Sequence, residues 1–207
     1  MHRRSLLVAA ATLLLPHGAQ AQAIGADQRS AVIVRLSQSI NAITRLSGRF
    51  RQTNPDGSLV AGRFWLQRPG KVRFEYDAPS PLLLISDGST VSLQDRKLRT
   101  TDRYPLRKTP LYFLLKSNVN LEQDVALTGL VRQGSLLKVT LRDKARQADG
   151  ELTVIYDEAN ESLREWTITD RQGRVTQVTL LDPQSKGPID GSLFQAPGPQ
   201  KRYDPKN

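Results

Sequence analysis

The 207-residue chain contains no cysteine, and its only two histidines, His2 and His17, lie close to the N-terminus. The absence of cysteine excludes disulfides, thiolate nucleophiles and cysteine-ligated metals. If the N-terminal segment is removed, as its pattern predicts, histidine-based triads and histidine-ligated zinc are excluded as well. Carboxylates, serine, lysine and tyrosine remain, so the composition disfavours catalysis. We expect a protein that is not an enzyme, with no catalytic residue, no metal and no cofactor.

The N-terminus has the pattern of a secretory signal peptide. Two arginines precede an apolar run over 6–15, and two Ala-x-Ala sequences end at Ala21 and Ala23. A run of about ten apolar residues is too short to cross a bilayer, which needs about 20. We therefore expect a signal peptide over 1–21, cleaved after Ala21 or Ala23, and one periplasmic domain over 24–207. The basic start fits Sec or twin-arginine export, and the alternative is an N-terminal amphipathic helix.

Basic residues outnumber acidic ones, 30 to 20. Two of the arginines fall in the expected signal, so the exported domain would carry 28 basic and 20 acidic residues, a net charge of +8. Export makes nucleic acid an unsuitable partner, which leaves an anionic lipid surface or an acidic protein. The charges are scattered along the chain, so a solvated basic face explains them equally well.

Hydrophobic periodicity predicts one helix followed by a long series of strands. Apolar residues recur every three or four positions from an N-cap at Asp27 to Leu46, after which the period changes to two. A Thr109-Pro110 pair opens a short apolar helix, Leu111 to Leu115. This pattern predicts a mainly β domain of ten or eleven antiparallel strands, curved and covered by the two helices. The expected strands include 60–68, 71–76, 82–85, 91–94, 98–104, 137–141, 152–156, 163–168 and 175–181.

Strand alternation makes Arg68 anomalous. The inward positions before it are apolar, as in Phe64 and Leu66, and the next strand continues inward with Val72 and Phe74. Strand alternation therefore places the Arg68 guanidinium at the mouth of an apolar interior. There its N–H donors could hold backbone carbonyls of a movable element. The alternative is that Arg68 lies at the rim and extends into water.

One ordered series of residues runs through the region 47–116. It consists of Arg68-Pro69, Phe74, Tyr76, Pro79, Ile85-Ser86-Asp87-Gly88, Asp95, Thr109-Pro110 and Leu114-Leu115. With the signal peptide, this series resembles the periplasmic outer-membrane lipoprotein carrier (LolA-type) family. The resemblance extends from the N-terminal helix to the region of Phe194, and it implies an incomplete barrel of about eleven strands with a helical lid.

The resemblance also implies a function and its residues. Such a carrier is a soluble monomer that takes lipoproteins from an inner-membrane ATP-driven (ABC) transporter and delivers them to a receptor or to the outer membrane itself. Arg68 would be the latch that holds the lid closed. Val72 replaces a usual aromatic, which affects the shape of the cavity. The acyl-chain cavity would be lined by Ile33, Leu36, Ile40, Phe50, Phe64, Leu66, Val72 and Phe74, and the lid would contain Pro110, Leu111, Phe113 and Leu114.

Other interpretations fit the same residues. The apolar helix at 111–115 could be a plain core helix, and the apolar face of the N-terminal helix could be ordinary core. Trp65 and Trp166 are expected to be structural. A periplasmic module that senses lipoproteins or another amphiphile is the alternative function. A carboxylate-based hydrolase is disfavoured because its candidate aspartates occupy turns and no Gly-x-Ser-x-Gly motif occurs.

Overall fold

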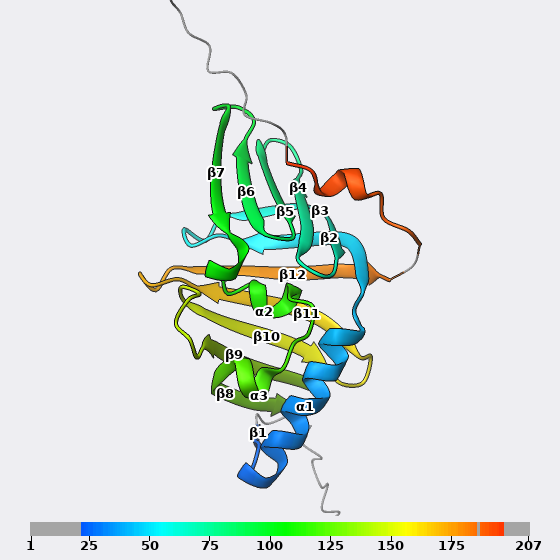
Figure 1. The fold of residues 1–207 in the computed structure, drawn as a ribbon, viewed down its shortest axis with the longest axis vertical. Coiled ribbons are helices and arrows are strands. Elements are labelled where there is room, and N and C mark those ends of the chain that lie inside the picture. The colour runs from blue at the N-terminus through cyan, green and yellow to red at the C-terminus, as the bar shows by residue number, and fades with distance from the viewer. Residues whose placement is uncertain (1–21, 186, 197–207) are drawn as a thin grey trace, which may run out of the picture.

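Eleven strands and one two-residue strand form a single antiparallel sheet in the computed structural model, which describes residues 22–185 and 187–196 (Figure 1). The sheet order is β1-β8-β9-β10-β11-β12-β2-β3-β4-β5-β6-β7, and β1 and β7 are its two edges. The predicted mainly β, incompletely closed fold is thus confirmed. The expected signal peptide over 1–21 lies outside the described residues. The strands are β1 (Gln22–Ala23), β2 (Arg45–Thr53), β3 (Leu59–Gln67), β4 (Lys71–Tyr76), β5 (Leu82–Asp87), β6 (Thr90–Asp95), β7 (Thr100–Pro105), β8 (Val125–Gln133), β9 (Leu136–Asp143), β10 (Glu151–Asp157), β11 (Ser162–Thr169) and β12 (Val175–Gln184).

The strands form because apolar residues alternate with polar ones along them. In β4 every second residue is buried, beginning with Val72, and β9 shows the same alternation. Figure 1 shows β4 to β7 running in a different direction from β8 to β12, so the sheet is strongly curved. The helices lie over its inner face. No helix of the described part of the chain is long and apolar enough to cross a membrane.

The N-terminal helix, α1, spans Ala26–Ala42 and is shorter than predicted. Its N-cap is Gly25, so the expected cap at Asp27 is wrong. Its C-cap is Ile43, and Leu46 lies in β2, where it pairs with Leu66 of β3. Leu46 fits both a helical and an alternating pattern, and strand pairing decides between them. The predicted helix was therefore too long at its C-terminal end.

The inserted segment between β7 and β8 holds more structure than the sequence predicted. A short 3-10 helix, η1 (Leu106–Lys108), precedes α2 (Tyr112–Leu115), and α3 (Leu121–Asp124) follows it. The expected N-cap at Thr109 is wrong, because the Thr109 hydroxyl donates to the Leu106 carbonyl at 2.8 Å and the cap position is Leu111. Asn120 caps the unpredicted α3.

An aromatic cluster fills the core beneath the helices. The Phe74 ring lies 4.9 Å from Phe50, 5.9 Å from Phe64 and 5.9 Å from Trp166, measured between ring centroids. Gly62 of β3 makes room for it, since a Cβ there would lie 2.7 Å from the Phe50 ring. Burial raises the pKa of the neighbouring Tyr76 to about 12. The interior of this protein is therefore filled by its own side chains.

The C-terminal part of the described chain is anchored to the sheet by Phe194. This residue ends a short 3-10 helix, η2 (Gly191–Phe194), and its side chain is buried. Arg73 of β4 donates to the Leu193 carbonyl at 3.2 Å.

Candidate functional site

The Arg68 side chain joins α1 to the segment that follows α2. Its guanidinium donates to the Ile40 carbonyl and, at 2.9 Å, to the Asn41 side-chain oxygen. It also donates to the carbonyls of Lys116 and, at 3.2 Å, Ser117. Desolvation by partial burial lowers the pKa of Arg68, but an arginine stays charged at neutral pH. One cation thus bridges two elements that lie far apart in the sequence.

Asn41 and Ser37 of α1 bind the same segment further along. The Asn41 side chain donates to the Val119 carbonyl and accepts from the Val119 N–H, both at 2.9 Å. The Ser37 hydroxyl accepts from the Leu121 N–H at 3.1 Å. The two residues are four apart, so they lie on one face of the helix. Neither residue was among the site residues predicted from the sequence.

The turn between β3 and β4 holds the end of α2. The Gly70 N–H donates to the Leu115 carbonyl at 2.7 Å, and the Ser86 hydroxyl donates to the Gly70 carbonyl at 2.7 Å. Gly70 has a φ of +75°, and a Cβ there would lie 2.6 Å from the Gly88 Cα. Only glycine fits this position without strain, so the sequence of the turn is fixed by its contact with Gly88.

We define the closing segment as residues 109–121. It buries the predicted Pro110, Phe113 and Leu114, while Leu111 is half-buried. Leu115 of the predicted apolar helix is buried too, and so are two residues beyond the expected lid, Val119 and Leu121. The closing segment is therefore longer than the expected lid and ends at the first residue of α3.

The residues predicted to line a cavity are packed together in one core cluster. Those from α1 face the sheet, and those from β2, β3 and β4 face α1 and the closing segment. Each is less than 9% exposed. In this closed arrangement they contact one another, so room for a ligand among them requires that the closing segment or α1 move. These residues are Ile33, Leu36, Ile40, Phe50, Phe64, Leu66, Val72 and Phe74.

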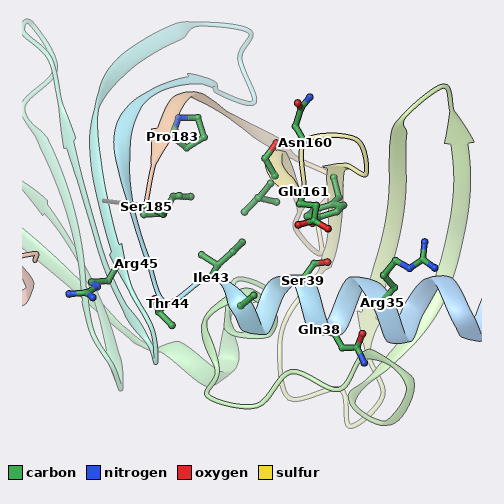
Figure 2. A pocket seen from close by; sticks show the side chains of 15 residues that line it. Arg35, Gln38, Ser39, Ile43, Thr44, Arg45, Asn160, Glu161, Pro183 and Ser185 are labelled. Atoms are coloured by element: carbon green, nitrogen blue, oxygen red, sulfur yellow. The ribbon is translucent and has the colours of Figure 1, made fainter. Parts of the chain in front are cut away.

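An open groove lies on the other flank of α1, between this helix and the β10–β11 turn (Figure 2). Its main hollow has a volume of about 660 Å³, and an adjoining hollow of about 180 Å³ shares four lining residues with it. None of the predicted cavity or lid residues lines the main hollow, and only Leu36 lines the smaller one. The shared residues are Arg35, Ser39, Tyr156 and Glu161. We call these two hollows together the α1 groove.

Charged residues are scattered around the sheet rather than gathered into a reactive centre. Among the described residues, no group of three or more His, Cys, Asp or Glu side chains is placed to hold a metal ion. The most strongly perturbed carboxyl is Asp157, whose pKa is lowered mainly by hydrogen bonds from Asn160 and Arg164. It fastens the β10–β11 turn, so its perturbation has a structural cause.

A protein-family model covers most of this chain. The model described as outer membrane lipoprotein carrier protein LolA matches residues 41–197. The match includes Arg68 and the whole closing segment, and it begins at the end of α1.

Individual relatives agree with the family match. The chain is 33% identical to an outer-membrane lipoprotein carrier protein of Chromohalobacter salexigens over 91% of this chain and 90% of that protein. It is 29% identical to a protein of the same name from Azotobacter vinelandii over 84% of this chain and 87% of that protein. A solved domain from Vibrio parahaemolyticus that is named for outer membrane lipoprotein sorting has a similar fold. It is 9% identical, with a TM-score of 0.50 over 81% of this chain and 96% of that domain.

Proposed function

Because this chain belongs to the outer membrane lipoprotein carrier protein LolA family, we propose that it carries lipoproteins through the periplasm with their acyl chains buried in its interior. It would receive each lipoprotein from an inner-membrane ATP-driven transporter and deliver it to an outer-membrane receptor or to the outer membrane itself. In this proposal the protein is a monomeric chaperone and catalyses no reaction.

Physical chemistry explains why such a carrier is needed. Each buried methylene contributes about 0.8 kcal/mol, so one acyl chain of about 16 carbons opposes passage through water by on the order of 10 kcal/mol. A carrier must offset this cost by offering apolar surface. The core of this protein has that surface in Phe50, Phe64 and Phe74, beneath a closing segment that hydrogen bonds hold in place.

The observation that carries the proposal is the hydrogen bonding of Arg68 to both α1 and the closing segment. In the closed state, the side chains of the closing segment cover the protein's own apolar surface. Cargo must displace that segment, so closure and cargo compete for the same surface. Competition of this kind keeps cargo affinity low enough for release, and it gives Arg68, Asn41 and Gly70 a functional reason to bind the segment.

The proposal is tested by identifying what the protein holds in cells. The mature chain carries a photo-reactive residue in place of Leu114, a buried residue of the closing segment. The matched control carries it in place of Leu98, which is exposed. Irradiation in the periplasm followed by mass spectrometry should give lipoprotein adducts from position 114 and few from position 98. Adducts that contain no lipoprotein would reject the carrier function and would turn attention to a sensor of another amphiphile.

A further inference from the structure

The α1 groove contains two buried hydroxyl groups without partners. The Tyr156 side chain is 4% exposed, and its hydroxyl has no hydrogen-bond partner among the described residues. The Ser162 hydroxyl is also buried without such a partner. Both residues line the main hollow. A buried hydroxyl that makes no hydrogen bond destabilises a protein. These two hydroxyls lie just behind the surface of the hollow, and a ligand that supplies hydrogen-bond acceptors would satisfy them once the lining side chains adjust.

The rest of the groove is amphipathic. Apolar side chains from both sides form part of its lining, with Ile43 and Leu46 near the end of α1 and Leu163 from β11. Figure 2 shows Ser39 of α1 and Glu161 of the β10–β11 turn facing each other across the hollow. This combination suits a ligand that has both a hydrocarbon part and neutral oxygen acceptors.

Charged side chains line the main hollow beside the two hydroxyls. Arg35 and Arg45 also line the main hollow, and neither forms an ion pair with another described residue. The Glu161 carboxylate shares the hollow and offsets one of these two positive charges, so the choice of acceptor rests on the two hydroxyls, which donate without carrying charge. Ester carbonyls accept hydrogen bonds without adding charge, and they accompany hydrocarbon in a diacylglycerol.

We propose that the α1 groove binds the ester-linked glycerol of a diacylglycerol group, with the Tyr156 and Ser162 hydroxyls donating to its ester carbonyls. This inference rests on the proposed function, since the diacylglycerol would be that of the lipoprotein anchor. A volume of about 660 Å³ lies within the usual range of small-molecule sites. Leu36 lines the smaller hollow and also belongs to the core cluster, so this one side chain separates the groove from the interior beneath α1.

The geometry of α1 keeps this site separate from the closing segment. Ser37 and Asn41 face the closing segment, whereas Arg35 and Ser39 line the groove. A ligand can therefore hold its glycerol on one flank of the helix while the closing segment moves on the other flank.

The test compares two lipids that differ only in their carbonyls. Dioctanoylglycerol has ester carbonyls, and dioctylglycerol, its ether analogue, has none. Calorimetric titration of the full mature chain should give about 25-fold tighter binding of the ester, which is the effect of two hydrogen bonds of about the usual strength. In Tyr156→Phe the preference for the ester should fall to about fivefold, while ether binding stays unchanged. Ser162→Ala should reduce the preference in the same direction.

Tyr104→Phe is the matched control, because Tyr104 is 52% exposed on the edge strand β7 and is not part of the groove. Equal binding of the two lipids by the wild type, or an unchanged ester preference in Tyr156→Phe, would overturn the groove assignment and leave the carrier function standing. Binding of neither lipid would overturn the groove assignment and count against the carrier function too. Thermal unfolding checks that every variant is folded.

Discussion

The polar groups on the two flanks of α1 have different partners. On the closing-segment flank, Arg68, Asn41 and Ser37 hydrogen-bond four residues of the closing segment, although the Arg68 Nε is buried without a partner among the described residues. On the groove flank, the Tyr156 and Ser162 hydroxyls are buried without partners in the described part of the chain. The first flank holds α1 to the closing segment, and the second flank carries the proposed ligand site. The same helix therefore separates the proposed latch from the proposed site.

The largest difference between the flanks is expected when two polar side chains of α1 are removed in turn, one that hydrogen-bonds the closing segment and one that lines the groove. Asn41→Ala deletes both bonds to Val119 and one from Arg68. We expect it to lower the free energy of unfolding by about 3 kcal/mol, because buried backbone groups lose their partners. Ser39→Ala, two residues away on the groove flank, should change it by less than about 0.5 kcal/mol. Urea denaturation measures both. Equal effects would remove the distinction between the flanks.

Arg68→Leu is expected to have a smaller effect on stability, about 2 kcal/mol, since the leucine keeps apolar contact while the charged hydrogen bonds are lost. Its main consequence should be faster hydrogen exchange at the Val119 and Leu121 N–H groups, with lipoprotein uptake retained and release to membranes impaired. Arg63→Leu, a change at an exposed arginine of β3, is the control. Release at the wild-type rate would show that Arg68 is not a latch.

Acid should loosen the groove flank. Hydrogen bonds from Asn160 and Arg164 lower the pKa of Asp157 below its ordinary value of 3.8. A carboxyl with a lowered pKa contributes stability above its ordinary pKa, and this contribution is lost as the pH falls through the folded-state value. Between pH 5 and pH 2, the protection factors of the Ala159 and Asn160 amides, which compare the observed exchange rate with the intrinsic rate at each pH, should therefore fall.

Asp157→Asn provides the control for that experiment, because an amide does not titrate. In this variant the protection factor of the Ala159 amide should be low already at pH 5 and should depend less on pH. If the wild type and this variant respond identically to acid, Asp157 does not fasten the groove wall.

The smallest expected effect is that of Tyr156→Phe on the unloaded protein. Removing a hydroxyl that has no partner should leave the midpoint of thermal unfolding unchanged or raise it, by the equivalent of up to about 1 kcal/mol. The same change at Tyr76, whose hydroxyl donates to Gln52 at 2.9 Å, should lower it by about 1 kcal/mol. A clear loss of stability in Tyr156→Phe would mean that the hydroxyl is bonded after all.

Local patterns predicted most of the sheet. Alternation located the strands, and the same parity singled out Arg68, because one charged residue interrupted an apolar face. The helix boundary failed at Leu46, where two periodicities agree and pairing with Leu66 decides. The α3 helix could have been found from Asn120 followed by Gln123, a spacing typical of a capped helix start.

The groove and the hydrogen bonds of Asn41 to the closing segment could not be predicted from local patterns. Asn41 looks like any polar residue on a helix, and its role depends on Val119, 78 residues away. The groove arises where the end of α1 meets the β10–β11 turn, which is more than 100 residues further along the chain. Tyr156 is buried in the alternating pattern of β10. Only the packing of the whole domain leaves its hydroxyl without a partner.

The central claim is that cargo opens the closing-segment flank and leaves the groove flank in place. Because the chain has no cysteine, spin labels can be attached at introduced cysteines alone. One pair joins Val34 of α1 to Asn118 of the closing segment, and a second joins Val34 to Ala159 of the β10–β11 turn. Pulsed electron paramagnetic resonance on the protein loaded with a lipoprotein should show a longer and broader 34–118 distance and an unchanged 34–159 distance. An unchanged 34–118 distance in the fully loaded complex would contradict the account.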